Sequence, residues 1–185
     1  EGDTIDVVVG FDQDMSLLDG DEDDPARAAH DCWSLRDRSA SGLGALLPAE
    51  AGEHIVLGAL MAFRPAAAER WQLGCIVRRI RLQDASQWII GIKRLSEAPL
   101  LIDLEPHVEE LQLEPEQTAD AAAIYAPITI DGGRIDGVVI DINRFSGNNE
   151  FVLPTGGGAF RIRANRVIDR GDRWIRIGFE VLGKR

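Results

Sequence analysis

The chain has 185 residues, a formal net charge of −11 and 45% hydrophobic residues. This length allows one large domain or two small ones, with enough apolar content for a core. No apolar run is long enough to cross a bilayer, and no basic, apolar secretory leader opens the sequence. These features predict a cytoplasmic protein that does not insert into a membrane. Because the first residue is Glu1, we expect the sequence to be part of a longer protein.

The acidity is concentrated at the N-terminus. Residues 1–31 hold eleven Asp and Glu against one Arg, which places −10 of the charge there and leaves −1 on the rest. Such a segment repels nucleic-acid phosphates, so we expect no DNA binding. We predict an acidic arm or linker over residues 1–31, in which residues 4–11 form either an edge strand or part of a preceding domain. Residues 19–30 resemble a calcium loop, but Asp24 and His30 stand where that loop needs Gly and Glu.

The cysteines and histidines give no sign of a metal site or a disulfide framework. Cys32 and Cys75 both lie in strand-like runs, which predicts buried thiols, with a single pairing between them as the alternative. His30, His54 and His107 lack metal-ligand spacing and are predicted to be surface residues.

Short strands are predicted along most of the chain after the acidic segment. In the first half they cover residues 32–35, 43–47, 56–63, 71–77 and 88–95, the last two forming a hairpin across residues 83–86. In the second half they cover residues 128–130, 138–140, 160–164 and 175–181, with turns at 131–133 and 169–172 and a hairpin tip at Gly156–Gly158. Residues 97–124, with three prolines, read as a connector that includes a helical turn at 108–111.

The second half echoes the first in its order of turn, strand and hairpin, which favours an internal repeat. In this alignment residues 141–154 are set against residues 37–48, and the two long hairpins are set against each other. The predicted fold is therefore all-β, with two small antiparallel six-stranded barrels at residues 32–96 and 125–185.

The most informative motif is the turn Asp37-Arg38-Ser39-Ala40-Ser41-Gly42, which reads D-x-S-x-x-G between two predicted strands. The Asp carboxylate supplies acceptors, the Ser hydroxyl is both donor and acceptor, and Gly lets a ligand approach the backbone. The plainer interpretation is that Asp, Ser and Gly are residues that turns prefer for their own conformation.

With the hairpin that ends in Trp88-x-x-Gly91-Ile92, this turn makes residues 32–96 resemble the PilZ family of bacterial receptors for cyclic di-GMP. The resemblance implies a six-stranded barrel whose ligand lies at Asp37, Ser39 and Gly42. It extends only weakly to residues 125–185, which would be a second, degenerate PilZ-like barrel.

The sequence departs from the family in its arginines. The family carries an R-x-x-x-R motif upstream of the turn, whereas residues 11–18 hold no arginine. Arg27, Arg36 and Arg38 are therefore the candidates for positive charge beside the ligand, with the alternative that Arg36 and Arg38 are simply exposed strand residues. A second basic cluster, Arg78, Arg79 and Arg81, would reach a phosphate only if its hairpin borders the turn; otherwise it is a solvated strand end.

The resemblance implies a non-catalytic receptor that relays cyclic di-GMP binding to a protein partner in motility, adhesion or secretion, and needs no other cofactor. Binding would order the acidic arm over the barrel. The alternative is a PilZ-like protein-interaction module that has lost the ligand along with R-x-x-x-R. No nucleophile–base arrangement or catalytic carboxylate pair emerges from the sequence, so we do not expect an enzyme.

Overall fold

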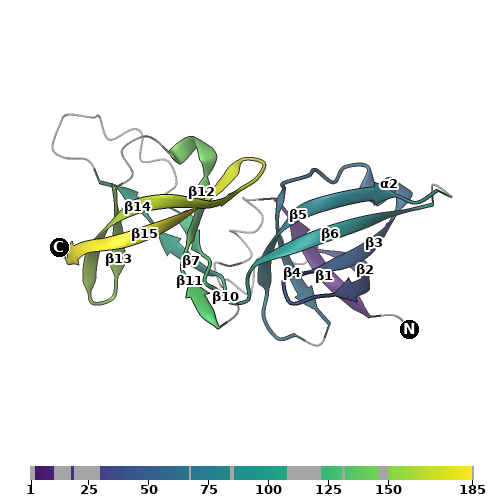
Figure 1. The fold of residues 1–185 in the computed structure, drawn as a ribbon, viewed down its shortest axis with the longest axis horizontal. Coiled ribbons are helices and arrows are strands. Elements are labelled where there is room, and N and C mark those ends of the chain that lie inside the picture. The colour runs from purple at the N-terminus through teal and green to yellow at the C-terminus, as the bar shows by residue number, and fades with distance from the viewer. Residues whose placement is uncertain are drawn as a thin grey trace.

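A computed structural model describes residues 3–10, 18, 30–66, 68–83, 86–107, 122–130, 132–145 and 150–184. The predicted helical turn at 108–111 and nearly all of the calcium-like loop lie outside these residues. Strands dominate the described chain and form two modules arranged end to end (Figure 1). The prediction of an all-β protein is confirmed. None of the described helices is long and apolar enough to cross a membrane.

The first module is a closed six-stranded antiparallel barrel with the strand order β1-β2-β3-β6-β5-β4. Its strands are β1 (Thr4–Val9), β2 (Asp31–Arg38), β3 (Gly42–Pro48), β4 (Leu60–Pro65), β5 (Gln72–Arg81) and β6 (Gln87–Ser96), with a short helix α2 (Ala49–Gly52) after β3. Strand β1 pairs with both β2 and β4 and so closes the barrel. The predicted boundary at residue 32 is thus wrong, because Ile5 and Val7 alternate into the core and make β1 part of this module.

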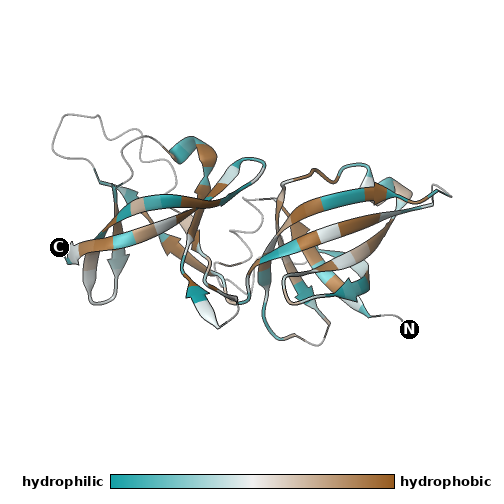
Figure 2. Cartoon of the chain, in the orientation of Figure 1, coloured by the Kyte–Doolittle hydropathy of each residue, from teal (hydrophilic) through white to brown (hydrophobic). Residues whose placement is uncertain are grey.

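The barrel core is filled by side chains that alternate inward along each strand. They include Trp33, Leu43, Leu47, Met61, Phe63, Ile76, Ile90 and Ile92. Strand β4 begins later than predicted, at Leu60, because residues 56–58 turn sharply and Gly58 adopts a φ of 82°. Figure 2 shows hydrophobic and hydrophilic residues alternating along the long strands of both modules.

The second module is a seven-stranded sheet with the order β7-β9-β12-β15-β14-β13-β8. Its strands are β7 (Leu100–Asp103), β8 (Glu105–Pro106), β9 (Ala122–Tyr125), β12 (Val138–Asp141), β13 (Glu150–Thr155), β14 (Gly158–Arg170) and β15 (Trp174–Lys184), and a 3-10 turn η3 (Ile142–Arg144) follows β12. Only the buried Leu104 separates β7 from β8, so the two edges of the sheet are consecutive pieces of chain and the sheet nearly closes. The predicted connector, residues 97–124, therefore supplies β7, β8 and most of β9.

One predicted hairpin is paired differently in the structure. Strand β10 (Ile128–Ile130) pairs with β11 (Gly133–Ile135), and the two form a separate two-stranded sheet. Strand β12, which holds residues 138–140, pairs instead with β9 and β15. Strand β11 is a Gly-Arg-Ile segment too short to show strand periodicity. The next apolar run, residues 138–140, was therefore predicted as the partner strand in its place.

The two modules repeat one strand order. Replacing β1 to β6 by β7, β9, β12, β13, β14 and β15 converts the order of the barrel into that of the second sheet. Both long hairpins also carry a register shift directly before an Arg–Gly pair, Arg78 with Gly91 and Arg166 with Gly178. The predicted alignment of residues 141–154 with residues 37–48 is wrong. Strand β12 takes the place of β3 in the strand order, so residues 141–154 correspond to the end of β3 and the segment that follows it.

A third apolar cluster joins the modules. Leu60, Leu73, Cys75 and Leu95 on the outside of the barrel pack against Ile124, Ala126, Val139 and Trp174 of the second sheet. Polar contacts border this cluster. The amide of Asp172 and the indole of Trp174 both donate to the carbonyl of Gly58, at 2.8 and 2.7 Å. The modules therefore share a core, which is the usual basis for behaving as one body.

The cysteines differ in burial. Cys75 is buried in the cluster between the modules, as predicted, whereas Cys32 is exposed, contrary to prediction. Strand β2 turns Trp33 into the barrel, so its neighbour Cys32 faces outward. Both are free thiols.

Candidate functional site

The D-x-S-x-x-G turn connects β2 to β3, and two of its residues maintain its shape. The backbone amide and the hydroxyl of Ser39 both donate to the carbonyl of Gly42, at 2.8 and 3.2 Å. A side chain on Gly42 would overlap the backbone carbonyl of Ile92 in β6. The conformation of the turn therefore accounts for Ser39 and Gly42. Asp37 is the motif residue whose side chain remains available to bind a ligand.

Asp37 presents its carboxylate on the outside of the barrel. The pairing of β2 with β3 shifts between Leu35 and Asp37, which brings Asp37 opposite Gly44. A Cβ on Gly44 would lie 2.6 Å from Oδ1 of Asp37, so the carboxylate lies directly over this glycine. The Asp37 side chain is 59% exposed and forms an ion pair with Arg36 at 3.8 Å. Such a loose pair leaves the carboxylate able to accept hydrogen bonds from a ligand.

Asp37 begins a row of outward-facing residues that crosses four strands. Asp37 pairs with Gly44, Gly44 with Gly91 of β6, and Gly91 with Arg78 of β5. At the far end the Arg78 side chain leans over Gly91, whose Cβ would lie 2.9 Å from that of Arg78. We call these four residues the glycine row. Because the carboxylate leans over Gly44 and the Arg78 side chain over Gly91, the two side chains cover neighbouring glycines, whose strands are roughly 5 Å apart.

An apolar row lies beside the glycine row. Leu46 of β3 pairs with Ile89 of β6, and Ile89 pairs with Ile80 of β5. Ile80 is 44% exposed whereas Ile89 is buried, so this strip of the barrel surface is accessible at its β5 end. The face thus combines an apolar floor with one acidic end and one basic end, an arrangement suited to a planar polar ligand.

The predicted basic cluster is divided by the structure. The hairpin borders the turn through β6, which pairs with β3, whereas Arg78 lies on β5, three strands from Asp37 on the same outer face. Arg79 and Arg81 instead stack on Trp88, with guanidinium carbons 4.0 and 5.6 Å from the ring centroid. Arg79 also donates to the carbonyl of Glu53 at 3.1 Å, so this pair stabilises the α2 end of the barrel.

The structure places the predicted residues Arg36 and Arg38 beside Asp37. Together with Asp3 and Leu35 they line an open hollow of about 360 Å³ on the β1 side of the turn. Arg27 lies outside the described residues.

Two further cations border the turn and were missed in the sequence. Lys93 of β6 pairs with Gly42, and the guanidinium of Arg94 donates to the carbonyl of Ala40 at 3.4 Å. Arg94 is 16% exposed and also pairs with Glu97 at 2.8 Å. Only the long-range pairing of β3 with β6 brings these residues to the turn, and no local pattern in the sequence reports that pairing.

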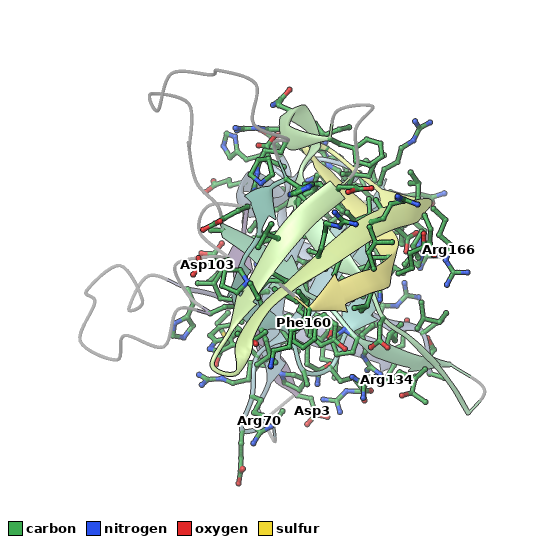
Figure 3. The ribbon with its side chains drawn as sticks, turned by 90° about the vertical axis from the view of Figure 1, so that its left-hand side faces the viewer. Asp3, Arg70, Asp103, Arg134, Phe160 and Arg166 are labelled. Carbon is green, nitrogen blue, oxygen red and sulfur yellow. The ribbon has the colours of Figure 1, made fainter. Side chains whose placement is uncertain are left out.

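Among the described residues of the second module, no turn matches the β2–β3 turn. Where the barrel has the tight β2–β3 turn, the chain from β9 to β12 carries the β10–β11 hairpin. Arg134 of this hairpin donates to Asp136 at 2.8 Å and to the hydroxyl of Tyr125 at 2.7 Å, and Figure 3 shows its side chain on the outside of the module. Hydrogen bonds from Tyr125 and Arg134 lower the pKa of Asp136, so its charge is already neutralised within the cluster.

No metal centre is found among the described residues, where no three His, Cys, Asp or Glu side chains gather around a common point. His30 and His54 are exposed and His107 is half-buried. Comparisons with protein-family models, with curated proteins and with solved structures find no match. The case for a function therefore rests on the residues of the barrel face itself.

Proposed function

We propose that this protein is a non-catalytic, cytoplasmic receptor of PilZ type that binds cyclic di-GMP on the outside of its first barrel and relays the binding to a partner protein. The observation that carries the proposal is the glycine row, in which the side chains of Asp37 and Arg78 lie over two neighbouring glycines on the outside of the barrel. This row begins at the D-x-S-x-x-G turn on which the resemblance to the family rests.

The chemistry of guanine suits the two ends of the row. The N1 and N2 donors of the base match the Asp37 carboxylate, while O6 and N7 accept a bidentate contact from an arginine such as Arg78. Gly44 and Gly91 are buried beneath the Asp37 and Arg78 side chains, so a flat ring would contact these two side chains from the outside.

The phosphates require positive charge that the R-x-x-x-R motif does not supply here. Arg36, Arg38, Arg78 and Lys93 all border the turn or the glycine row, and each is exposed. Charges on a half-solvated face contribute modestly and are weakened by salt. We therefore expect binding that is weaker at higher ionic strength.

Isothermal titration of the whole chain with cyclic di-GMP at low salt tests the proposal, with GTP as the control ligand. We expect micromolar or tighter binding that Arg78→Gln weakens about tenfold, which corresponds to roughly 1.4 kcal/mol. Arg81→Gln is the matched control, because it removes the same charge from the same strand three residues away, beside Trp88 and outside the glycine row. No heat and no thermal shift at high ligand concentration would reject the receptor.

A protein-interaction module is the second candidate, favoured by apolar side chains that remain open beside the glycine row. Val77 is 55% and Ile80 44% exposed. Exposed apolar surface of this kind is typical of docking faces. The paired substitution Asp37→Ala and Ser39→Ala separates the candidates, because an interaction module should lose stability only and still capture its partner.

A further inference from the structure

Lys93 faces outward next to the glycine row and is held by the second module. It lies two residues from Gly91 along β6 and opposite Gly42 of the turn. Its ammonium group forms an ion pair at 2.6 Å with Asp169 of β14. The Lys93 side chain is 44% exposed, so one side of the ammonium remains open to solvent. Lys93 is thus a cation at the candidate site, and its ion-pair partner, Asp169, belongs to the second module.

Asp169 has a second cation within reach. It pairs across the β14–β15 ladder with Arg176, which is 2% exposed. Arg176 donates to the carbonyl of Ala126, but its Nε has no hydrogen-bond partner among the described residues. Burial lowers the pKa of Arg176, while the carboxylates of Asp169 and Asp136 oppose that shift. A buried guanidinium with an unsatisfied donor gains from a closer carboxylate.

We infer that Lys93 is a phosphate-binding residue of the proposed site, and that Asp169 moves towards Arg176 when a phosphate of the nucleotide takes the Lys93 ammonium. This inference rests on the proposed function. The exchange leaves no charge unpaired, because the phosphate replaces Asp169 at Lys93 while Arg176 receives the released carboxylate. The free energy lost when Asp169 leaves Lys93 is offset by the phosphate at Lys93 and by the carboxylate that Arg176 gains.

The exchange would transmit binding to the second module. The Lys93–Asp169 pair is one of several links, and the contacts of Gly58 with Asp172 and Trp174 are independent of it. The modules therefore stay together while the β14–β15 hairpin shifts. Arg166 lies further along this hairpin and reaches into solvent on the flank of the second module in Figure 3, where a partner could sense the shift.

Titration of the whole chain with cyclic di-GMP tests the inference through charge-matched variants. We expect Asp169→Asn to tighten binding about three- to tenfold, because Lys93 is then released. We expect Lys93→Gln to weaken binding by a similar factor, and the double variant to bind as Lys93→Gln does. Asp172→Asn is the control, since it removes a carboxylate from the same hairpin, and it should bind as the natural chain does.

The outcomes separate the two proposals. If the natural chain binds but Asp169→Asn and Lys93→Gln match the Asp172→Asn control, the role of Lys93 is rejected and the receptor stands. If the natural chain does not bind cyclic di-GMP, the receptor is rejected, and the role of Lys93 with it. Pyrophosphate is a second titrant: binding as strong as that of the nucleotide would show a general anion site and overturn the assignment to a nucleotide phosphate.

Discussion

Two glycines of the barrel face, Gly42 and Gly44, differ in what a methyl group would meet. At Gly42 the methyl group would overlap the backbone carbonyl of Ile92, which cannot move without separating β3 from β6. At Gly44 it would meet the Asp37 carboxylate, the end of a side chain that can rotate away. The first glycine is therefore needed for folding, and the second keeps the carboxylate in position.

Alanine at each of these positions tests the distinction. We expect Gly42→Ala to lower the free energy of unfolding by about 3 kcal/mol, because the strands must separate. Gly44→Ala should change it by less than about 1 kcal/mol but weaken ligand binding, since Asp37 is displaced. Urea denaturation and titration measure the two effects. Equal losses of stability would contradict this account of Gly44.

The two thiols should react at very different rates. Burial between the modules raises the pKa of Cys75 to about 11, so almost none of it is thiolate at pH 8. Cys32 is exposed. A thiol reagent at pH 8 should modify one cysteine in the native protein and both after denaturation, and Cys32→Ser should remove the fast reaction. Rapid modification of Cys75 in the native chain would show that the modules separate.

At the residue scale, the sequence predicted what depends on neighbours along the chain. Arg36, Asp37 and Arg38 are consecutive residues of β2, so their proximity follows from the sequence itself. Lys93 and Arg94 were missed, since the β3–β6 pairing that brings them to the turn is long-range. Cys32 was predicted to be buried because it lies in an apolar run. In the structure the Trp33 side chain points into the barrel, so the side chain of its neighbour Cys32 points outward.

At the scale of elements, the long hairpins were the most predictable part of the fold. Strands β5 with β6 and β14 with β15 alternate clearly and are joined by local turns. The short strands β7, β8 and β11 were not predicted, because runs of two to four residues carry too little periodicity and exist only through their partners. The internal repeat could be predicted from the two long hairpins. The alignment of the strands before the hairpins could be established only from the order of the strands in the two sheets.

The hairpin β10–β11 should loosen in acid. Hydrogen bonds from Tyr125 and Arg134 hold the pKa of Asp136 below its usual value. A carboxyl group whose pKa is lower in the folded state stabilises that state above its unfolded pKa, near 4, and loses this effect as pH falls through the folded pKa. The protection factors of the amides in β10 and β11, which correct for the slower intrinsic exchange in acid, should therefore fall below about pH 4.

Asp136→Asn is the control for this acid response. The substitution keeps the shape of the side chain but removes the group that titrates. The hairpin of the variant should exchange faster at neutral pH and show little further change in acid. An acid response that survives in Asp136→Asn would assign it to another group.

At the scale of the whole molecule, the cluster between the modules predicts one cooperative unfolding transition. Trp174 is fully buried there and donates to Gly58 of the other module. Trp174→Ala removes the largest side chain of this cluster, at a cost of about 3–5 kcal/mol, and should divide the calorimetric transition into two. Trp88→Ala, in the α2 end of the barrel, should lower the single transition without dividing it. Two transitions in the natural chain would show that the modules are independent.

The central claim is that the outside of the first barrel binds cyclic di-GMP. Amide hydrogen exchange of the whole chain, with and without saturating cyclic di-GMP, tests this claim most directly because it locates the ligand. We predict slower exchange in the turn from Asp37 to Gly42 and in β6 around Gly91, with β13 unchanged. Protection confined to the second module, or no protection anywhere, would contradict the claim.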